Sequence, residues 1–307
     1  MDEPQARRWL ISGIAPTLGR VQPLFEHRLA LAGYETRALE LEGDGPPLLL
    51  LHGYSDSADT WRLLLERLGR VGRRAVALDM PGFGTADLLA IDEPILPQLE
   101  RFAAAAVEWI APEGGAVVCG NSLGGCVSLL VAERDDLGLA GIVPVAPAGL
   151  DMARWFAVIE REPLLRAVLA SPVPVPSVVL QRIVGEVYKR LAFHRPAGLE
   201  PLVTATFASH FADKGTTARL MATGRRVIGE LRDPYRLEAI DCPVLLVWGR
   251  QDVMVFQTGA DRVLDAVEHS QLVTIEDCGH CPQLENPDRL MQLLLDFPAA
   301  NAAAIAS

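Results

Sequence analysis

The sequence of 307 residues lacks any apolar run approaching the roughly 20 residues that a membrane-spanning helix needs. Two strongly apolar stretches, Leu48–Leu51 and Val244–Val247, each end after a few residues. The first residues, Met1–Pro4, start acidic and are not followed by the basic, apolar and small-residue segments of a signal peptide. These absences predict a protein without a membrane span, and we expect a cytoplasmic location.

Positive charge is also scarce, because 28 lysine and arginine residues stand against 39 aspartate and glutamate residues. The net charge of −11 argues against a nucleic-acid partner, since a phosphate backbone would be repelled. The five cysteines are odd in number and lie mostly in apolar runs. That usage is typical of reduced thiols in a reducing compartment and not of a disulfide framework.

Signals for a bound cofactor are missing as well. The spacing of cysteine and histidine gives no four-ligand zinc set. The segment Asp79–Gly84 has too few glycines to cradle a phosphate, and no G-x-G-x-x-G or Walker element follows a first strand. We therefore expect no metal and no organic cofactor.

What the sequence does have is an alternation of short apolar runs with helical patterns. This alternation predicts an α/β fold with a mostly parallel, doubly wound sheet. A hydrophobic content of 50% suits a sheet that is buried on both faces. The expected strands are Tyr34–Glu42, Leu48–Leu51, Ala75–Leu78, Ala116–Cys119, Ala140–Val145, Pro243–Trp248 and Leu272–Ile275. The expected helices beside them begin near Ser57 or Asp59 and also span Ile95–Ile110, Gly259–Val267 and Asp288–Phe297.

The alternation of strand and helix patterns stops between residues 151 and 233, where strand signals are missing and prolines separate helical patterns. We expect residues 1–150 and 234–307 to form the core and residues 151–233 to form an inserted, all-helical lid (cap). The predicted lid helices are Met152–Arg161, Leu164–Leu169, Val178–Phe193, Leu199–Phe211 and Thr216–Leu231. Most lid aromatics are expected to pack against the body, and some to roof an apolar pocket. Residues 1–26 are predicted as a short helix with loops, residues 44–47 as a turn, and residues 298–307 as a frayed end.

The segment Gly120–Gly124 has the pattern G-x-S-x-G between a strand and a helix. This elbow is too sharp for ordinary backbone geometry, and side chains two residues either side of Ser122 would clash. It exposes one hydroxyl above a helix N-terminus, where backbone N–H groups face developing negative charge. Ser122 is therefore the predicted nucleophile.

A serine nucleophile needs a base and an acid that orients the base. Asp252 follows the strand ending at Trp248, and His280 follows the next strand. All three residues come just after predicted strands, which is the edge where open α/β sheets keep their sites. Asp151, after the strand Ala140–Val145, is the alternative acid.

Together with the elbow, four further motifs resemble the α/β-hydrolase family, in its serine-nucleophile branch with a helical lid. They are His52-Gly53, the turn at Asp79, the Asp252 loop and the His280 loop, and the resemblance covers about residues 34–150 and 236–307. It implies a Ser122–His280–Asp252 triad. It also implies an oxyanion hole made by the backbone N–H groups of Leu123 and Tyr54, with His52 as a residue that fixes its loop.

The resemblance favours a serine esterase that cleaves a small apolar ester through an acyl-enzyme. Asn121 and the lid also resemble hydrolases that cleave carbon–carbon bonds in dienoic ring-cleavage products, so a ketone substrate is the second possibility. A perhydrolase side activity and a non-catalytic small-molecule receptor are further alternatives. The C-x-x-C segment Cys278–Cys281 suggests a redox site, but too little chain follows it for a thioredoxin-like domain.

Overall fold

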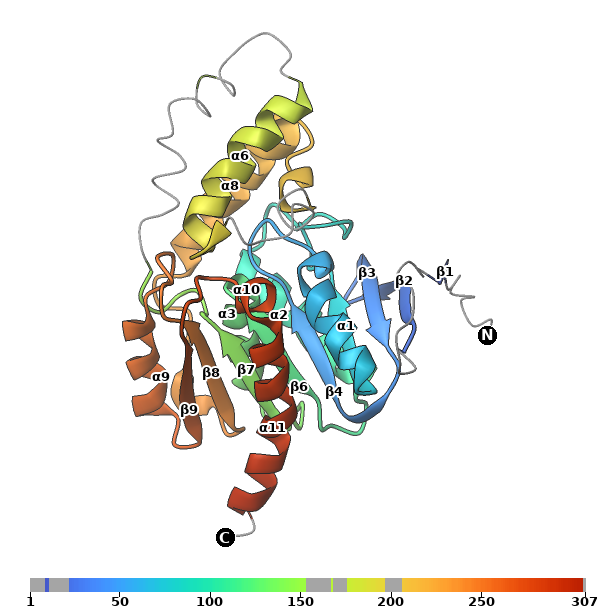
Figure 1. Cartoon of the computed structure of the whole chain (residues 1–307), viewed down its shortest axis with the longest axis vertical. Helices are drawn as coiled ribbons and strands as arrows, with labels where there is room; N and C mark the ends of the chain where they lie inside the picture. The colour runs from blue at the N-terminus through green and yellow to red at the C-terminus, as the bar shows by residue number, and fades with distance from the viewer. Residues whose placement is uncertain (1–8, 11–21, 153–166, 168–175, 197–205, 306–307) are drawn as a thin grey trace.

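Figure 1 shows the computed structural model of the chain, which describes residues 9–10, 22–152, 167, 176–196 and 206–305. Within those residues the strands form a nine-stranded sheet in the order β1-β2-β3-β5-β4-β6-β7-β8-β9. The strands are β1 (Trp9–Leu10), β2 (Leu24–Leu31), β3 (Tyr34–Leu41), β4 (Asp44–Leu51), β5 (Arg73–Leu78), β6 (Val117–Asn121), β7 (Gly141–Val145), β8 (Val244–Gly249) and β9 (Ser270–Ile275).

In the sheet, the six neighbouring strands β5, β4, β6, β7, β8 and β9 pair in parallel. Strands β1, β2 and β3 form an antiparallel edge, and β3 pairs with β5. Residues Ala32 and Gly33 connect β2 to β3, and both have positive φ angles, of 50° and 86°. A two-residue turn of this kind matches the twist of paired strands. The predicted α/β fold with a mostly parallel sheet is confirmed.

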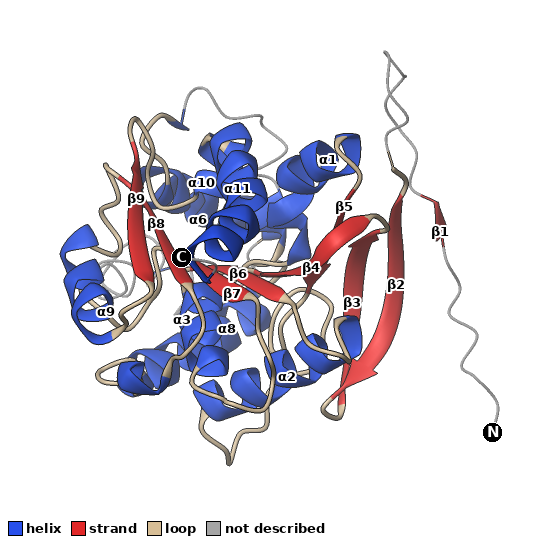
Figure 2. Ribbon diagram, turned by 90° about the horizontal axis from the view of Figure 1, so that it is seen from below, coloured by secondary structure: helices blue, strands red, loops and turns tan. Residues whose placement is uncertain are grey.

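Helices cover both faces of the sheet (Figure 2). One face carries α1 (Arg62–Arg70), which continues η1 (Ala58–Trp61), and α11 (Pro287–Ile305). The other face carries α2 (Ile95–Ile110), α3 (Leu123–Ala132) and α9 (Ala260–Ala266). The apolar run of β4 serves both faces, because successive side chains of a strand alternate. Leu48 and Leu50 therefore join one core cluster, while Leu49 and Leu51 join the other.

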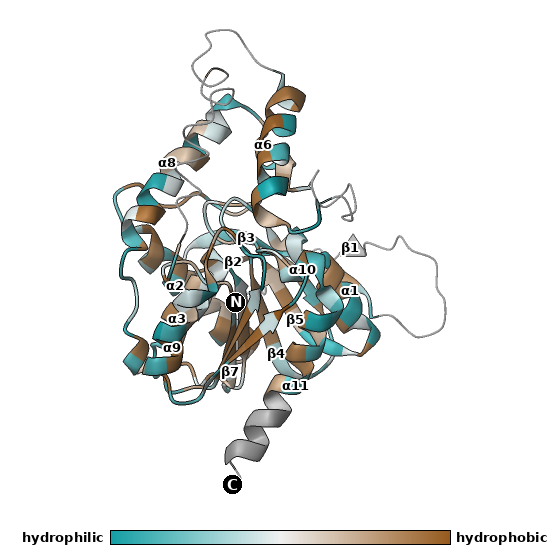
Figure 3. Cartoon of the chain, turned by 60° about the vertical axis from the view of Figure 1, so that its left-hand side comes forward, coloured by the Kyte–Doolittle hydropathy of each residue, from teal (hydrophilic) through white to brown (hydrophobic). Residues whose placement is uncertain are grey.

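Two further helices, α6 (Ser177–Ala192) and α8 (Lys214–Glu230), lie beyond the carboxyl ends of the parallel strands (Figure 1). Both mix apolar and polar residues along their length, in contrast to the mostly apolar central strands such as β4 and β7 (Figure 3). The Glu230 carboxylate accepts hydrogen bonds from the N–H groups of Ile95 and Leu96, each at 2.8 Å. It thereby caps the N-terminus of α2 and attaches the end of α8 to the body.

Several sequence predictions need correction. The N-terminal helix is wrong where the structure describes the chain, since residues 9–10 and 24–31 are strands, and the rest of residues 1–21 is outside the described residues. The predicted turn at residues 44–47 is part of β4, which has an irregular register there. Helix α11 continues to Ile305 instead of ending near Phe297. The predicted helices 152–161 and 164–169 and most of 199–211 fall outside the described residues, so the lid boundaries remain a prediction.

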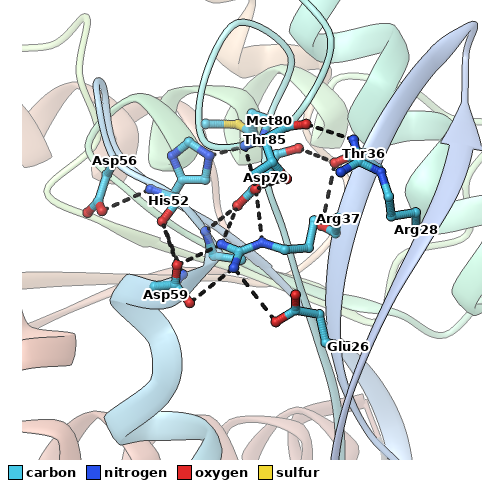
Figure 4. Close-up of polar contacts among 12 residues, drawn as sticks. Glu26, Arg28, Thr36, Arg37, His52, Asp56, Asp59, Asp79, Met80 and Thr85 are labelled. Carbon is cyan, nitrogen blue, oxygen red and sulfur yellow. Dashed lines mark hydrogen bonds and ion pairs between the residues drawn. The ribbon is translucent and has the colours of Figure 1, made fainter. Parts of the chain in front are cut away.

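A buried ion-pair network joins β3, β5 and the loop after β4 (Figure 4). The fully buried Asp79 carboxylate accepts from Arg37 Nε at 3.1 Å, from Ala58 N–H at 2.8 Å and from Thr85 N–H at 2.8 Å. The Arg37 guanidinium also donates to Asp59 at 2.7 Å. Burial disfavours the charged Asp79 carboxyl, but the hydrogen bonds and charge of Arg37 outweigh it and hold the pKa of Asp79 below its ordinary value.

We predict that Asp79→Ala lowers the free energy of unfolding by about 3–5 kcal/mol, because it leaves the Arg37 cation without its buried partner. Urea denaturation followed by circular dichroism measures this change. The matched control is Asp288→Ala, which breaks the exposed Arg67–Asp288 pair of 2.7 Å and is expected to cost less than about 1 kcal/mol.

The loss of stability in Asp79→Ala is expected to depend on pH. A carboxyl with a lowered folded-state pKa stabilises the fold above its unfolded pKa, and this stabilisation is lost as the pH falls. The stability difference between wild type and Asp79→Ala is therefore expected to be largest at neutral pH and to shrink as the pH falls below about 4 and through the lowered folded-state pKa. A difference as large in acid as at neutral pH would show that Asp79 does not act through its charge.

Candidate active site

The site begins at the turn between β6 and α3. Ser122 occupies this turn with a φ of +54°, an unfavourable angle for a residue with a side chain. A Cβ on Gly120 would lie 2.1 Å from the Gly124 carbonyl oxygen, and one on Gly124 would lie 2.2 Å from the Leu51 carbonyl oxygen. Both positions therefore require glycine, as the elbow motif predicts. The Ser122 N–H donates to Val145 O at 2.9 Å, which fixes the turn against β7.

The loops after β8 and β9 bring an acid and an imidazole together. His280 Nδ1 lies 2.7 Å from Asp252 Oδ2, and both residues are buried. The other carboxylate oxygen, Oδ1, accepts from the N–H groups of Met254 at 2.8 Å and Val255 at 3.1 Å. The Asp252 carboxylate is thus fixed from two sides, and its remaining oxygen orients the imidazole.

The alternative acid does not take part in this contact. Asp151 is exposed and accepts a hydrogen bond from the Thr258 hydroxyl. Of the two candidate acids, the structure brings Asp252 to His280.

The second imidazole nitrogen of His280, Nε2, is buried and has no hydrogen-bond partner among the described residues. His280 and Ser122 both line one cavity beneath α6 and α8. Most of the lining side chains are apolar or aromatic. The lining consists of Gly53, Tyr54, Ser55, Asp56, Asn121, Ser122, Ile183, Val184, Val187, Tyr188, Leu191, Phe207, Phe211, Thr217, Met221, Met254, His280 and Cys281.

A second, smaller cavity also reaches Ser122 and Tyr54. It is lined further by Leu123, Ala148, Met152, Gly224, Val227, Ile228 and Leu231. The Tyr54 phenol borders both cavities and donates a hydrogen bond to the Leu220 carbonyl on α8. Space for a ligand therefore extends from Ser122 in two directions.

The two predicted oxyanion donors lie beside Ser122, the predicted nucleophile. Leu123 is the first residue of α3, so its N–H has no acceptor in the preceding turn of the helix. Tyr54 follows Gly53, whose Cα is so close to the elbow that a Cβ there would lie 3.5 Å from Ser122 Cβ. The function of both N–H groups as donors stays a prediction.

His52 is fixed in a neutral form beneath this loop. Met80 N–H donates to His52 Nε2 at 2.9 Å, and His52 Nδ1 donates to Gly53 O at 2.7 Å. Burial lowers the pKa of His52 to about 4, which agrees with one protonated and one accepting nitrogen. His52 thus connects the Gly53–Tyr54 loop to the end of β5, as expected of a loop-fixing histidine.

The contacts that three polar residues make around the His280 loop were not predicted from the sequence. Asn121 Nδ2 donates to His280 O at 2.9 Å, and Gln283 Nε2 donates to Asn121 Oδ1 at 3.1 Å. The Glu285 carboxylate accepts from Gly279 N–H at 2.7 Å. The contacts join residues far apart in the chain, 159 positions in the case of Asn121 and His280. No local motif marks such contacts.

Helix α6 and the residues that follow it also hold this loop. His280 N–H donates to Ala192 O, at the end of α6, at 2.8 Å. The other oxygen of Glu285 accepts from His194 N–H at 2.8 Å. The backbone that carries the imidazole is therefore attached to α6 as well as to the elbow.

Three aromatic residues of the predicted lid contribute to the wall of the larger cavity. Tyr188 on α6 stacks on Phe207 at a centroid distance of 3.3 Å, and both rings line the larger cavity with Phe211. The aromatics at positions 155 and 156, which the lid prediction includes, fall outside the described residues.

The C-x-x-C segment gives no redox site. Cys278 and Cys281 are free and buried. Burial raises the pKa of both thiols, which disfavours the reactive thiolate. Cys281 Sγ instead lies 3.5 Å from the Tyr188 hydroxyl.

Two features are absent from the part of the chain that the structure describes. No group of three or more histidine, cysteine, aspartate or glutamate side chains is placed to hold a metal ion. None of the helices there combines the length and hydropathy that a transmembrane segment requires.

Comparison with known proteins identifies similar chains. Monoacylglycerol lipase ABHD6 of Bos taurus is 25% identical over 84% of this chain and 77% of its own length. The 2-hydroxy-6-oxo-6-(2'-aminophenyl)hexa-2,4-dienoic acid hydrolase of Metapseudomonas resinovorans is 26% identical over 88% of this chain and 89% of its own length. The crystal structure of a bacterial membrane phospholipase A is similar with a TM-score of 0.73 and 23% identity, over 90% of this chain and 86% of that one.

The sequence profile of the Alpha/beta hydrolase family matches residues 48–293, a span that includes the elbow, the Asp252 loop and the His280 loop. This match and the two hydrolases similar in sequence confirm the predictions of an α/β-hydrolase fold and of a hydrolase. The chain belongs to the alpha/beta hydrolase family.

Proposed function

We propose that the protein hydrolyses an apolar ester with Ser122 as nucleophile, His280 as base and Asp252 as the orienting acid. The observation that carries this proposal is the His280 imidazole. Its Nδ1 is held 2.7 Å from Asp252, while its buried Nε2 has no partner among the described residues and shares a cavity with Ser122. A general base needs this combination of a fixed tautomer and one free nitrogen.

The proposed reaction has two steps. His280 Nε2 takes the Ser122 proton while the serine oxygen attacks the ester carbonyl, and the N–H groups of Leu123 and Tyr54 stabilise the oxyanion. His280 then gives its proton to the leaving alcohol, and an acyl-serine remains. Water, deprotonated by the same imidazole, releases the acid and restores Ser122.

The shape and lining of the site support an apolar ester. Both cavities at Ser122 have mainly apolar walls, which suit an acyl chain on one side and an alcohol on the other. Helices α6 and α8 supply much of these walls, so we propose that they act as a lid that excludes water. The relatives named as a monoacylglycerol lipase and a phospholipase A are consistent with a lipid-like ester.

Carbon–carbon bond hydrolysis is the second candidate, because the Metapseudomonas resinovorans relative is named as a dienoic acid hydrolase. Asn121, the residue before Ser122 that carries the resemblance to that branch, donates a hydrogen bond to His280 O and accepts one from Gln283. A panel of p-nitrophenyl esters of increasing chain length, tested beside a dienoic ring-cleavage product, separates the two. A preference for the dienoic compound would favour the second candidate, and turnover of neither would favour a receptor.

We also propose a cytoplasmic location. The five cysteines are all free, which is usual in a reducing compartment.

We predict that Ser122→Ala lowers kcat for p-nitrophenyl butyrate by about five orders of magnitude, since the acyl-enzyme cannot form. Stopped-flow and steady-state release of p-nitrophenol measure the loss. The control is Ser128→Ala on α3, which removes another buried hydroxyl, donated to Gly125 O at 2.8 Å, and is expected to retain most of the activity. Equal rates for wild type and Ser122→Ala would contradict the mechanism.

We predict that Asp252→Asn lowers kcat by about four orders of magnitude, because an amide N–H facing Nδ1 favours the tautomer with its proton on Nε2. Asp151→Asn is the matched control, since Asp151 is exposed and bonds Thr258 instead of His280. The same p-nitrophenyl assay is used. A large loss of activity in Asp151→Asn with little effect in Asp252→Asn would show that the acid is Asp151, which follows β7.

A further inference from the structure

The two cavities that meet at Ser122 have almost entirely different walls. Among the described residues, only Ser122 and Tyr54 line both of them. His280 lines the larger cavity alone, and Leu123 lines the smaller cavity alone. The proposed base and one of the proposed oxyanion donors therefore mark different sides of Ser122, and each side has its own space for a part of the substrate.

The Tyr54 side chain is a fixed boundary between the two cavities. Its hydroxyl donates a hydrogen bond to the Leu220 carbonyl on α8. Its ring also packs edge to face against Phe83, at a centroid distance of 5.6 Å. The ring cannot move aside without losing both contacts, so the two cavities remain separate spaces that are joined only at Ser122.

The two cavities also differ in size. The larger has a volume of about 70 Å³ and the smaller a volume of about 20 Å³. A volume of about 10–15 Å³ holds one water molecule, which is about the size of a methyl group. The smaller cavity therefore has room for one or two methyl-sized groups, and the larger for several times as many. Apart from Ser122 and Tyr54, the described walls of the smaller cavity carry no polar side chain.

The proton transfer decides which part of an ester lies in which cavity. In the acylation step, the bond between the carbonyl carbon and the alcohol oxygen breaks. The proton that His280 took from Ser122 then passes to that oxygen. The leaving oxygen must therefore come within hydrogen-bond distance of His280 Nε2. Because His280 lines the larger cavity and not the smaller one, the alcohol extends into the larger cavity, and the smaller cavity is left for the acyl chain.

We propose that the smaller cavity binds the acyl chain and the larger cavity binds the alcohol, so that the preferred substrate is an ester of a short acyl group with a larger apolar alcohol. The carbonyl carbon and the carbon next to it lie at Ser122 itself. Room for one or two further methyl-sized groups then limits the acyl group to about four carbons. The inference rests on the proposed ester hydrolysis and names the class of ester that the site selects.

Two isomeric esters test this orientation in the wild-type protein. Hexyl acetate and ethyl hexanoate contain the same atoms, but the short and the long chain are exchanged between the acyl and the alcohol side. We expect kcat/KM to be at least about tenfold higher for hexyl acetate, because even one methylene too many in an apolar pocket costs about tenfold or more. Titration of the released acid at constant pH measures both rates, and Ser122→Ala protein gives the background.

Two isoleucine variants locate the acyl chain. Ile228 on α8 lines only the smaller cavity, Ile183 on α6 lines only the larger one, and both are half-buried. Butyl acetate and butyl hexanoate share their alcohol and differ only in acyl length. Ile228→Ala is expected to raise kcat/KM for butyl hexanoate relative to butyl acetate at least about fourfold, since it makes room for at least one methylene. Ile183→Ala is the matched control and should change both esters by the same factor. Circular dichroism checks that each variant is folded.

The outcomes separate this inference from the proposed function. Ser122-dependent turnover with equal rates for the two isomers, or with a preference for ethyl hexanoate, would overturn the assignment of the cavities and retain the esterase. The assignment would also be overturned if the acyl preference changed in Ile183→Ala but not in Ile228→Ala, or in neither variant. Equal rates for wild type and Ser122→Ala with every ester would reject the esterase, and the assignment with it.

Discussion

The close approach of β6 to α3 is the constraint on which the site depends. Two glycines make it feasible, since a side chain on Gly120 or Gly124 would overlap backbone carbonyls at about 2 Å. Only this approach gives Ser122 its φ of +54° and places the following N–H at the start of a helix. Because β6 lies in the middle of a sheet covered on both faces, the core supports the strained turn.

The loop after β9 that carries His280, in contrast, is held by polar contacts from several directions. Asn121 binds it to the elbow, Glu285 binds the preceding residue, and Ala192 O accepts the His280 N–H from the end of α6. Each contact satisfies a backbone group that would otherwise be buried and unpaired. His280 and Ser122 are thereby fixed relative to each other, and the position of His280 also depends on α6. A movement of α6 would therefore shift the backbone that carries the His280 imidazole.

The sequence predicted those parts of the site that follow local rules. Ser122, Asp252 and His280 each stand just past an apolar run, so strand periodicity and short motifs were sufficient to find them. The strand Leu24–Leu31 was missed, because it is mostly half-buried and mixes charged with apolar residues, and so lacks the continuous apolar run of β4 or β8. Pairings such as Asn121 with His280 or Asn121 with Gln283 arise only when distant segments meet, and no spacing in the sequence encodes them.

Three histidines near the cavity illustrate how partners determine chemistry. Both ring nitrogens of His52 are satisfied by backbone groups, so that imidazole can only fix a loop. One nitrogen of His280 is held by Asp252, and the other is unpaired at a cavity that Ser122 also lines, which is the condition that a base requires. His210 has an unpaired nitrogen near a carboxyl but is too far from it for a hydrogen bond.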